Sequence, residues 1–174
     1  MAGDLLVLTP EQLALATPAQ REQYRRYLIF ESKERDQWQT LLPALAPGYA
    51  SKPFAPHHEQ FWDWVWEIRK DVRSAPYVAI WPRGQGKSTS AEMATAMTGA
   101  RDTRKYVLYV SETQEQADDH VNNVAAILMS EEIGLTFPDM GERLVDKHGN
   151  SRGWRRDRIR TGSGFTVDLS LIHI

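Results

Sequence analysis

The sequence predicts an α/β fold in which helices flank a parallel sheet, preceded by a helical N-terminal segment. Two apolar runs of strand length, residues 77–81 and 106–110, are each followed by a helical pattern. A glycine-rich turn separates the first run from its helix, and Ser111 follows the second run as a candidate helix cap. Strand, loop, helix, strand and helix in this order are typical of a parallel α/β sheet.

The first 52 residues are interpreted as a helical leader with a linker. Threonine–proline pairs near the start suit a capping hydroxyl followed by the first residue of a helix. The pattern predicts a helix over residues 18–42 that Pro43 ends, and a proline-rich linker over residues 46–56. We therefore divide the chain into a leader at residues 1–52 and an α/β domain at residues 53–168.

A further helix is expected from His57 to Val72, at the start of the α/β domain. Apolar side chains recur there at helical spacing, at positions Phe61, Val65, Ile68 and Val72. Three tryptophans, Trp62, Trp64 and Trp66, lie around this stripe. So much aromatic surface favours packing in a core over a role in ligand binding.

The C-terminal part of the domain is expected to form a hairpin. Residues 158–161 and 165–168 read as short strands around the turn Gly162-Ser163-Gly164. The last six residues, 169–174, resemble the translation of a transposon-end adaptor used in sequencing libraries. We therefore expect the natural sequence to diverge after Asp168, with a genuine apolar C-terminal strand as the alternative.

Composition excludes several classes of function. The apolar fraction of 41% and charged fraction of 25% are ordinary for a globular protein, and no apolar run approaches the length of a membrane span. The absence of cysteine excludes disulfides and thiolate chemistry and suits an intracellular setting. The net charge of −2 hides a segregation, since residues 106–140 hold seven acidic and no basic side chains. A nucleic-acid partner cannot be inferred from net charge, although a local basic face is compatible with it.

The turn after the first predicted strand has the composition of a phosphate-binding loop. A helix N-terminus presents free N–H groups and a positive dipole end to an anion, and Gly84 and Gly86 let the backbone approach it closely. Lys87 is expected to reach the β- and γ-phosphates, and the Ser88 hydroxyl to bind Mg²⁺. The residues predicted to bind ATP and its Mg²⁺ are Arg83, Gly84, Gln85, Gly86, Lys87, Ser88 and Thr89.

Two positions make this loop unusual. The strict motif has a glycine five residues before Gly86, where this chain has Trp81, so a plain glycine turn is the alternative interpretation. Arg83 lies inside the loop and is the candidate catalytic residue, because an arginine there could neutralise charge that develops in the transition state. A surface arginine paired with a carboxylate is the alternative for Arg83.

The loop from Pro82 to Thr89 resembles that of the large terminase subunits of tailed bacteriophages, whose phosphate loops lack the first glycine and carry an arginine at the position of Arg83. The similarity runs in order from Phe54 to Asp168. Its segments are residues 54–62, 106–120, 149–154 and 161–165. The resemblance implies a partial P-loop NTPase domain of the RecA/ASCE type.

The family's further site residues map unevenly onto this chain. An adenine-contacting glutamine is often found in the segment upstream of the family's loop, where this chain has His57 and His58, with Gln60 close by. We therefore assign His58 and Gln60 as candidate adenine contacts. The resemblance implies that the Walker B aspartate and the catalytic glutamate lie downstream of Asp168. Asp168 itself is disfavoured as that aspartate because no glutamate follows it.

The resemblance implies an ATPase that couples hydrolysis to translocation of double-stranded viral DNA into a procapsid. It would work as a homo-oligomeric ring in the host cell cytoplasm, docked on the portal protein with the small terminase subunit, and away from any membrane. This chain alone is not expected to hydrolyse ATP, since the acidic residues that complete the reaction are missing from it. A helicase-like translocase and a non-catalytic nucleotide- or DNA-binding module are the alternatives.

Two other groups of side chains are candidate sites. Five arginines lie within nine positions, at Arg152, Arg155, Arg156, Arg158 and Arg160. They could contact DNA phosphates or form the solvated edge of a hairpin, and the sequence favours neither. The five histidines show no spacing typical of a metal site.

Overall fold

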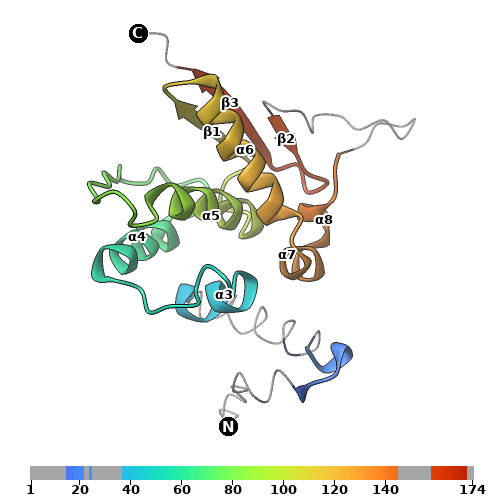
Figure 1. Cartoon of the computed structure of the whole chain (residues 1–174). Helices are drawn as coiled ribbons and strands as arrows, with labels where there is room; N and C mark the ends of the chain where they lie inside the picture. Colours follow the sequence, from blue (N-terminus) through green and yellow to red (C-terminus); the bar gives the residue numbers. More distant parts are fainter. Residues whose placement is uncertain (1–14, 22–23, 25–36, 145–157, 172–174) are drawn as a thin grey trace.

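The computed structural model describes residues 15–21, 24, 37–144 and 158–171. The helices labelled in Figure 1 are α3 (Trp38–Leu45), α4 (Pro56–Glu67), α5 (Lys87–Ala100), α6 (Gln114–Leu128), α7 (Glu131–Thr136) and α8 (Pro138–Gly141). The strands are β1 (Tyr106–Ser111), β2 (Arg158–Arg160) and β3 (Thr166–Leu171). The chain is therefore a mixed helix-and-strand protein, as the sequence predicts.

The three strands form one small sheet in the order β1-β3-β2. Strand β1 pairs with β3 in parallel, from Tyr106 opposite Thr166 to Ser111 opposite Leu171. Strand β2 pairs with β3 antiparallel, and the turn between them includes Gly164 with a φ of 84°. The predicted hairpin and the predicted strand at 106–110 are confirmed, but the sheet is mixed and not wholly parallel.

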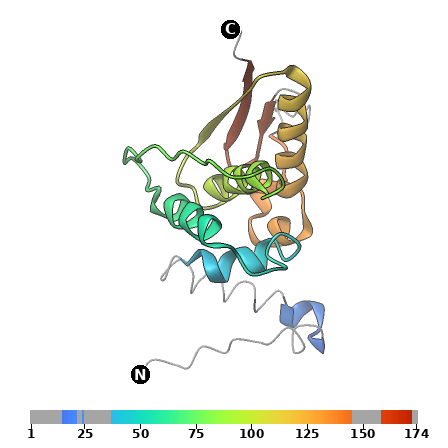
Figure 2. The same cartoon turned by 60° about the vertical axis from the view of Figure 1, so that its left-hand side comes forward.

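Helix α6 covers one face of this sheet and no described element covers the other (Figure 2). Val107 and Tyr109 of β1 lie on the covered face together with the fully buried Val167 of β3. Leu108 and Val110 point to the opposite face and are about half exposed. In β1, residues 106–110 are all apolar, so their unequal burial follows from their position in the sheet and not from residue type.

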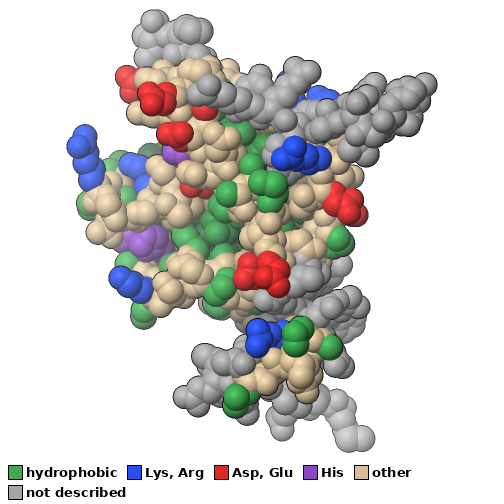
Figure 3. Space-filling model, turned by 45° about the vertical axis from the view of Figure 1, so that its right-hand side comes forward, with side chains coloured by type: hydrophobic (Ala, Val, Ile, Leu, Met, Phe, Trp, Pro, Cys, Tyr) green, Lys and Arg blue, Asp and Glu red, His purple; other side chains and the backbone are tan. Residues whose placement is uncertain are grey.

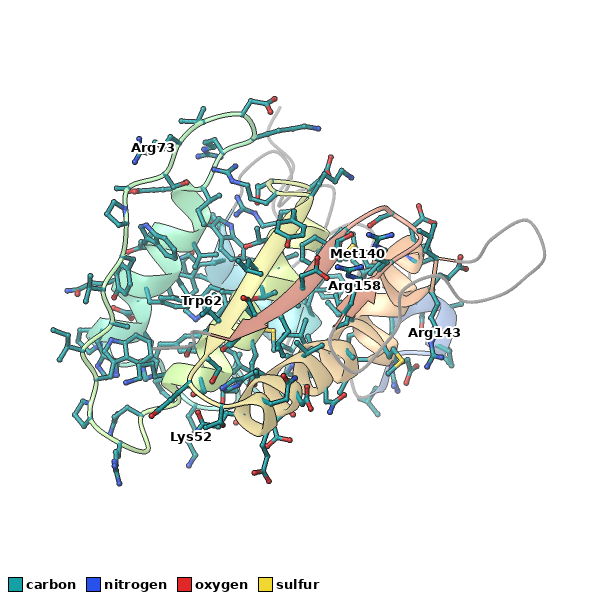
Figure 4. All side chains as sticks on the ribbon, turned by 90° about the horizontal axis from the view of Figure 1, so that it is seen from above. Lys52, Trp62, Arg73, Met140, Arg143 and Arg158 are labelled. Atoms are coloured by element: carbon teal, nitrogen blue, oxygen red, sulfur yellow. The ribbon has the colours of Figure 1, made fainter. Side chains whose placement is uncertain are left out.

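A second layer of helices forms an aromatic core below the sheet. Helices α3, α4 and α5 pack together around Trp62, which is 0% exposed and lies inside the molecule in Figure 4. The buried side chains around it include Trp38, Leu41, Leu42, Leu45, Phe61, Val65, Trp66, Met93 and Met97. The interpretation of the tryptophans as core residues is confirmed, with Trp64 only partly buried.

The strand expected at residues 77–81 is wrong. Val78 and Ile80 are 78% and 88% exposed, and this segment has no strand partner among the described residues. The side chains that alternate with them pack on α4, where the rings of Tyr77 and Trp81 lie 5.6 and 5.7 Å from that of Phe61. The segment therefore packs on a helix through one side, and its backbone gains no ladder of strand hydrogen bonds.

Several predicted boundaries also move. Helix α4 ends at Glu67, and Val72 is 57% exposed beyond a turn in which Asp71 has a φ of 60°. Pro43 lies inside α3 and does not end it. Helix α6 takes its cap from Thr113, whose side chain accepts the Gln116 N–H at 3.3 Å, and not from Ser111.

Some predictions fall outside the described residues. They include most of the leader helix and the three arginines Arg152, Arg155 and Arg156. Of the expected adaptor-derived tail, residues 169–171 continue β3 and pair with β1, and residues 172–174 are outside the described part. Residues 166–171 thus form one continuous strand that crosses the expected boundary at Asp168.

Candidate functional site

The candidate phosphate loop has a backbone that only glycine adopts readily. Gly84 and Gly86 have φ angles of 79° and 69°, in the left-handed region that side chains disfavour. A Cβ atom at either position would meet no heavy atom within 4 Å, so space does not require glycine there. The need for glycine is conformational, as expected for a loop whose backbone turns sharply into a helix.

Helix α5 begins at Lys87, immediately after this turn. Gly86 is its N-cap and supplies no side-chain cap, and the Ser90 N–H is bonded back to the Gly86 carbonyl. The N–H groups of the first turn therefore have no partner within the helix, and they carry the positive end of its dipole. This is the arrangement that binds phosphate oxygens in other proteins.

The predicted site residues of the loop lie together and are open to solvent. All residues from Arg83 to Thr89 are exposed, and Lys87 and Ser88 occupy the first two positions of α5. A triphosphate at the helix N-terminus would thus have an ammonium group and a hydroxyl group on the same turn. Within the described part of the chain, no three His, Cys, Asp or Glu side chains gather where they could hold a metal ion.

Helix α4 contacts the loop at two points. The Nε2 atom of His58 lies 2.9 Å from the Gln85 carbonyl oxygen, and its Nδ1 atom accepts the Ala55 N–H at 3.3 Å. The ring of Trp81, which occupies the position of the missing glycine, lies edge-on to His58 at 5.0 Å. Helix α4 begins here because Pro56 occupies its first turn, where a missing N–H costs nothing.

The structure brings only one of the two candidate adenine contacts onto the loop. His58 is half-buried and both of its ring nitrogens are engaged within the protein. Gln60 is exposed on α4. Contact of either residue with adenine stays a prediction, and His58 has a second candidate role in holding the loop.

A partly buried pair of hydroxyl groups joins the linker to α5. The Tyr49 hydroxyl lies 2.8 Å from the Ser90 Oγ atom and accepts a hydrogen bond from the Trp62 indole at 3.1 Å. Burial raises the pKa of Tyr49, and the hydrogen bonds to Ser90 and Trp62 partly oppose that rise. Sequence analysis missed this contact, because nothing in a proline-rich linker indicates that its tyrosine packs under the phosphate loop.

A buried carboxylate on α5 is the second feature that sequence analysis missed. Glu92 is 5% exposed and contacts His120 Nδ1 at 2.6 Å and Asn123 Nδ2 at 3.0 Å, both on α6. Burial, with the charge of Glu92, raises the pKa of Tyr109 to about 12. In the sequence, the feature that could have indicated this contact is Glu92 itself, the one acidic residue in a helix of mostly small and apolar residues. The cluster joins α5 to α6 behind the loop.

The far end of α4 is also tied to α5. Arg101 donates to the carbonyl oxygens of Val65 and Trp66, each at 3.3 Å, and its guanidinium lies 4.3 Å from the centre of the Trp66 ring. A cation at a helix C-terminus satisfies free carbonyls and the negative end of the dipole. Helix α4 is thus attached to α5 at one end and to the loop at the other.

Asp168 is engaged on the open face of the sheet. It forms an ion pair with Arg158, and the Tyr106 hydroxyl donates to it at 3.1 Å. The hydrogen bond from Arg158 lowers the pKa of Asp168. These contacts join β3 to both of its neighbouring strands through Asp168.

No family model, curated protein or solved structure matches this chain.

In the described residues, no helix is both long and apolar enough to cross a membrane. Figure 3 shows acidic side chains gathered where α6 begins, and the exposed Glu112, Glu115 and Asp119 lie in that part of the chain.

Proposed function

We propose that this chain is the nucleotide-binding part of a DNA-packaging ATPase of the terminase large-subunit type. The observation that carries the proposal is the glycine-rich turn, in which left-handed Gly84 and Gly86 lead directly into the first residue of α5, Lys87. Three features follow this turn that a generic glycine turn does not require. They are a helix N-terminus that no side chain caps, a lysine at the first helical position and a hydroxyl at the second. The type of motor rests on the sequence resemblance.

Each loop residue has a defined task in this proposal. The N–H groups at the start of α5 would hold phosphate oxygens, and Lys87 would reach the β- and γ-phosphates. Ser88 would bind Mg²⁺, which neutralises charge on the phosphates when it is bound. Arg83 would act on charge that develops at the γ-phosphate. His58 and Gln60 would lie near the adenine.

The partners of the intact protein belong to the same proposal. They are double-stranded viral DNA, the portal protein and the small terminase subunit, acting with a homo-oligomeric ring in the host cytoplasm. Turnover is proposed only for the intact protein, because hydrolysis needs a residue that orients the attacking water. Two adjacent acids after an apolar strand downstream of Asp168, followed by a carboxylate-rich nuclease domain, would support this proposal. A helicase-type acidic box there would contradict it.

The direct test is nucleotide binding by the chain itself. Lys87→Ala should abolish saturable binding of a fluorescent ATP analogue with Mg²⁺, because the charge-assisted hydrogen bonds it removes contribute about 1.5–3 kcal/mol each. In the intact enzyme, Arg83→Ala should lower turnover far more than nucleotide affinity, because its proposed role is at charge that develops in the transition state. If the Lys87→Ala variant binds as tightly as the parent, the phosphate-loop assignment is wrong.

A further inference from the structure

We infer that His58 is a positioning residue for the phosphate loop, which holds the Gln85 carbonyl so that the Gly86 N–H faces the phosphate. The inference rests on the proposed nucleotide-binding function and adds to it a residue outside the loop. It assigns to His58 a contact with the protein backbone, in contrast to a contact with the nucleotide base.

The two hydrogen bonds of His58 define its tautomer. The Nδ1 atom accepts the Ala55 N–H at 3.3 Å, so in the neutral ring this nitrogen carries the lone pair. The proton is then on Nε2, which donates to the Gln85 carbonyl oxygen at 2.9 Å. The same side chain thus completes the N-terminus of α4 and holds the loop.

The carbonyl that His58 holds controls the direction of the next N–H. In a trans peptide the C=O and the following N–H point in opposite directions, so a Gln85 carbonyl turned toward α4 directs the Gly86 N–H away from α4. Gly86 has a φ of 69° and no side chain, so rotation of this peptide meets little resistance. A rotated peptide would present a carbonyl oxygen to an anion, which repels it.

The imidazole is itself held by neighbouring rings. The His57 ring lies 4.1 Å from that of His58, and the rings of Trp81 and Phe54 lie 5.0 and 6.0 Å away. Trp81 belongs to the chain that enters the loop, so α4 contacts the loop on both sides of Arg83 and Gly84. Together with Arg101 at the other end of α4, these contacts give His58 a stable frame.

The test compares two substitutions at this position. His58→Phe keeps an aromatic ring against Trp81 but has no donor, and it should weaken Mg²⁺-dependent binding of a fluorescent ATP analogue about threefold to tenfold, the effect of one lost hydrogen bond. His58→Gln keeps an N–H donor at similar reach, and glutamine suits the third position of a helix. It should restore most of the affinity.

A ligand without a base separates positioning from adenine contact. Inorganic tripolyphosphate with Mg²⁺, measured by displacement of the fluorescent analogue, should lose affinity for His58→Phe by the same factor as ATP. An unchanged affinity for tripolyphosphate would overturn the inference and leave an adenine contact. Equal ATP affinity of the parent and His58→Phe would overturn it while the Lys87-dependent binding, and so the proposed function, still stands.

A nucleotide-free measurement completes the test. Long-range ¹H–¹⁵N NMR of the full chain should show His58 protonated on Nε2 and unprotonated on Nδ1. The opposite tautomer would overturn the inference whether or not the chain binds ATP. If the tautomer is as expected but the parent shows no Lys87-dependent binding, the proposed function fails, and the positioning role falls with it.

Discussion

The two faces of the three-stranded sheet differ in what covers them although they share the same strands. On the face toward α6, Val167 and Ile159 are 0% exposed and Val107 packs against the core. On the other face, Leu108 of β1 is half exposed, and the ion pair of Arg158 with Asp168 joins β2 to β3. Figure 2 shows described helices on the first face only.

In β1 the difference in burial is therefore set by the neighbouring elements, whereas in β2 and β3 residue type also differs between the faces, with Ile159 and Val167 on one and Arg158 and Asp168 on the other. Residues 106–110 of β1 are uniformly apolar, yet alternate side chains have opposite environments because successive side chains of a strand point to opposite faces. We therefore expect substitutions on the covered face to change stability strongly. Substitutions on the open face should change it weakly, and mainly through charge.

The largest effect is expected where α5 approaches the covered face. A Cβ atom at Gly99 would lie 2.6 Å from the buried ring of Phe165, which is 1% exposed and cannot move into solvent. Gly99→Ala should therefore lower the free energy of unfolding by about 2 kcal/mol, after a gain in helix propensity of up to about 1 kcal/mol is included. Urea denaturation followed by circular dichroism measures this.

Gly134 supplies the matched control for that substitution. It lies in α7, where an added Cβ atom would meet nothing within 4 Å. Gly134→Ala should leave stability unchanged or raise it by up to about 1 kcal/mol. If both variants behave alike, the close contact between α5 and the chain entering β3 is not as described, and the contrast between the faces loses its main support.

An intermediate effect is expected on the open face, at Asp168. Arg158 lowers the pKa of this carboxyl below its usual value of 3.8, so the native state favours the charged form. The stabilisation is present above the unfolded pKa and is lost as the pH falls through the native value. Asp168→Asn should cost about 0.5–1 kcal/mol at pH 7, since Arg158 is partly exposed.

The pH dependence distinguishes this ion pair from a packing effect. The difference in unfolding free energy between the parent and Asp168→Asn should shrink as the pH falls below about 4, where the unfolded state takes up the proton first, and should disappear below the lowered native pKa, where the carboxyl is protonated in both states. A difference that stays constant down to pH 2 would mean that the charge does not stabilise this face. Acid titrations of both proteins at several urea concentrations give the comparison.

The sequence predicted the local features of the molecule well. The strand at 106–110, the hairpin, the burial of the tryptophans and the glycine turn before α5 each follow from a pattern within a few neighbouring residues. The prediction of a strand at 77–81 was wrong because one side of a continuous apolar run can pack on a helix while the other side stays exposed, as Val78 and Ile80 do. An apolar run alone does not show which of its side chains are buried or which element buries them.

The contacts around the candidate site could not be predicted for the same reason. His58 and Gln85 are 27 positions apart, and Glu92 and His120 are 28 apart, so both pairs depend on how helices pack. The loop residues themselves were predictable because a glycine turn, a lysine and a hydroxyl lie next to each other in the chain. The sequence does not show that His58, which lies outside the loop, contacts the Gln85 carbonyl.

The smallest effect is expected at Leu108, and it tests the difference between the two faces of the sheet within the apolar strand β1. Leu108→Ser on the open face of β1 should change the unfolding free energy by no more than about 0.5 kcal/mol, since the side chain is already 50% exposed. Val167→Ala, on the covered face of the adjoining β3, should cost at least about 1 kcal/mol and shows that the assay detects lost packing. A large loss for Leu108→Ser would mean that this face is covered in solution. A self-association that disappears with the same substitution, seen by analytical ultracentrifugation, would identify a second copy of the chain as the cover.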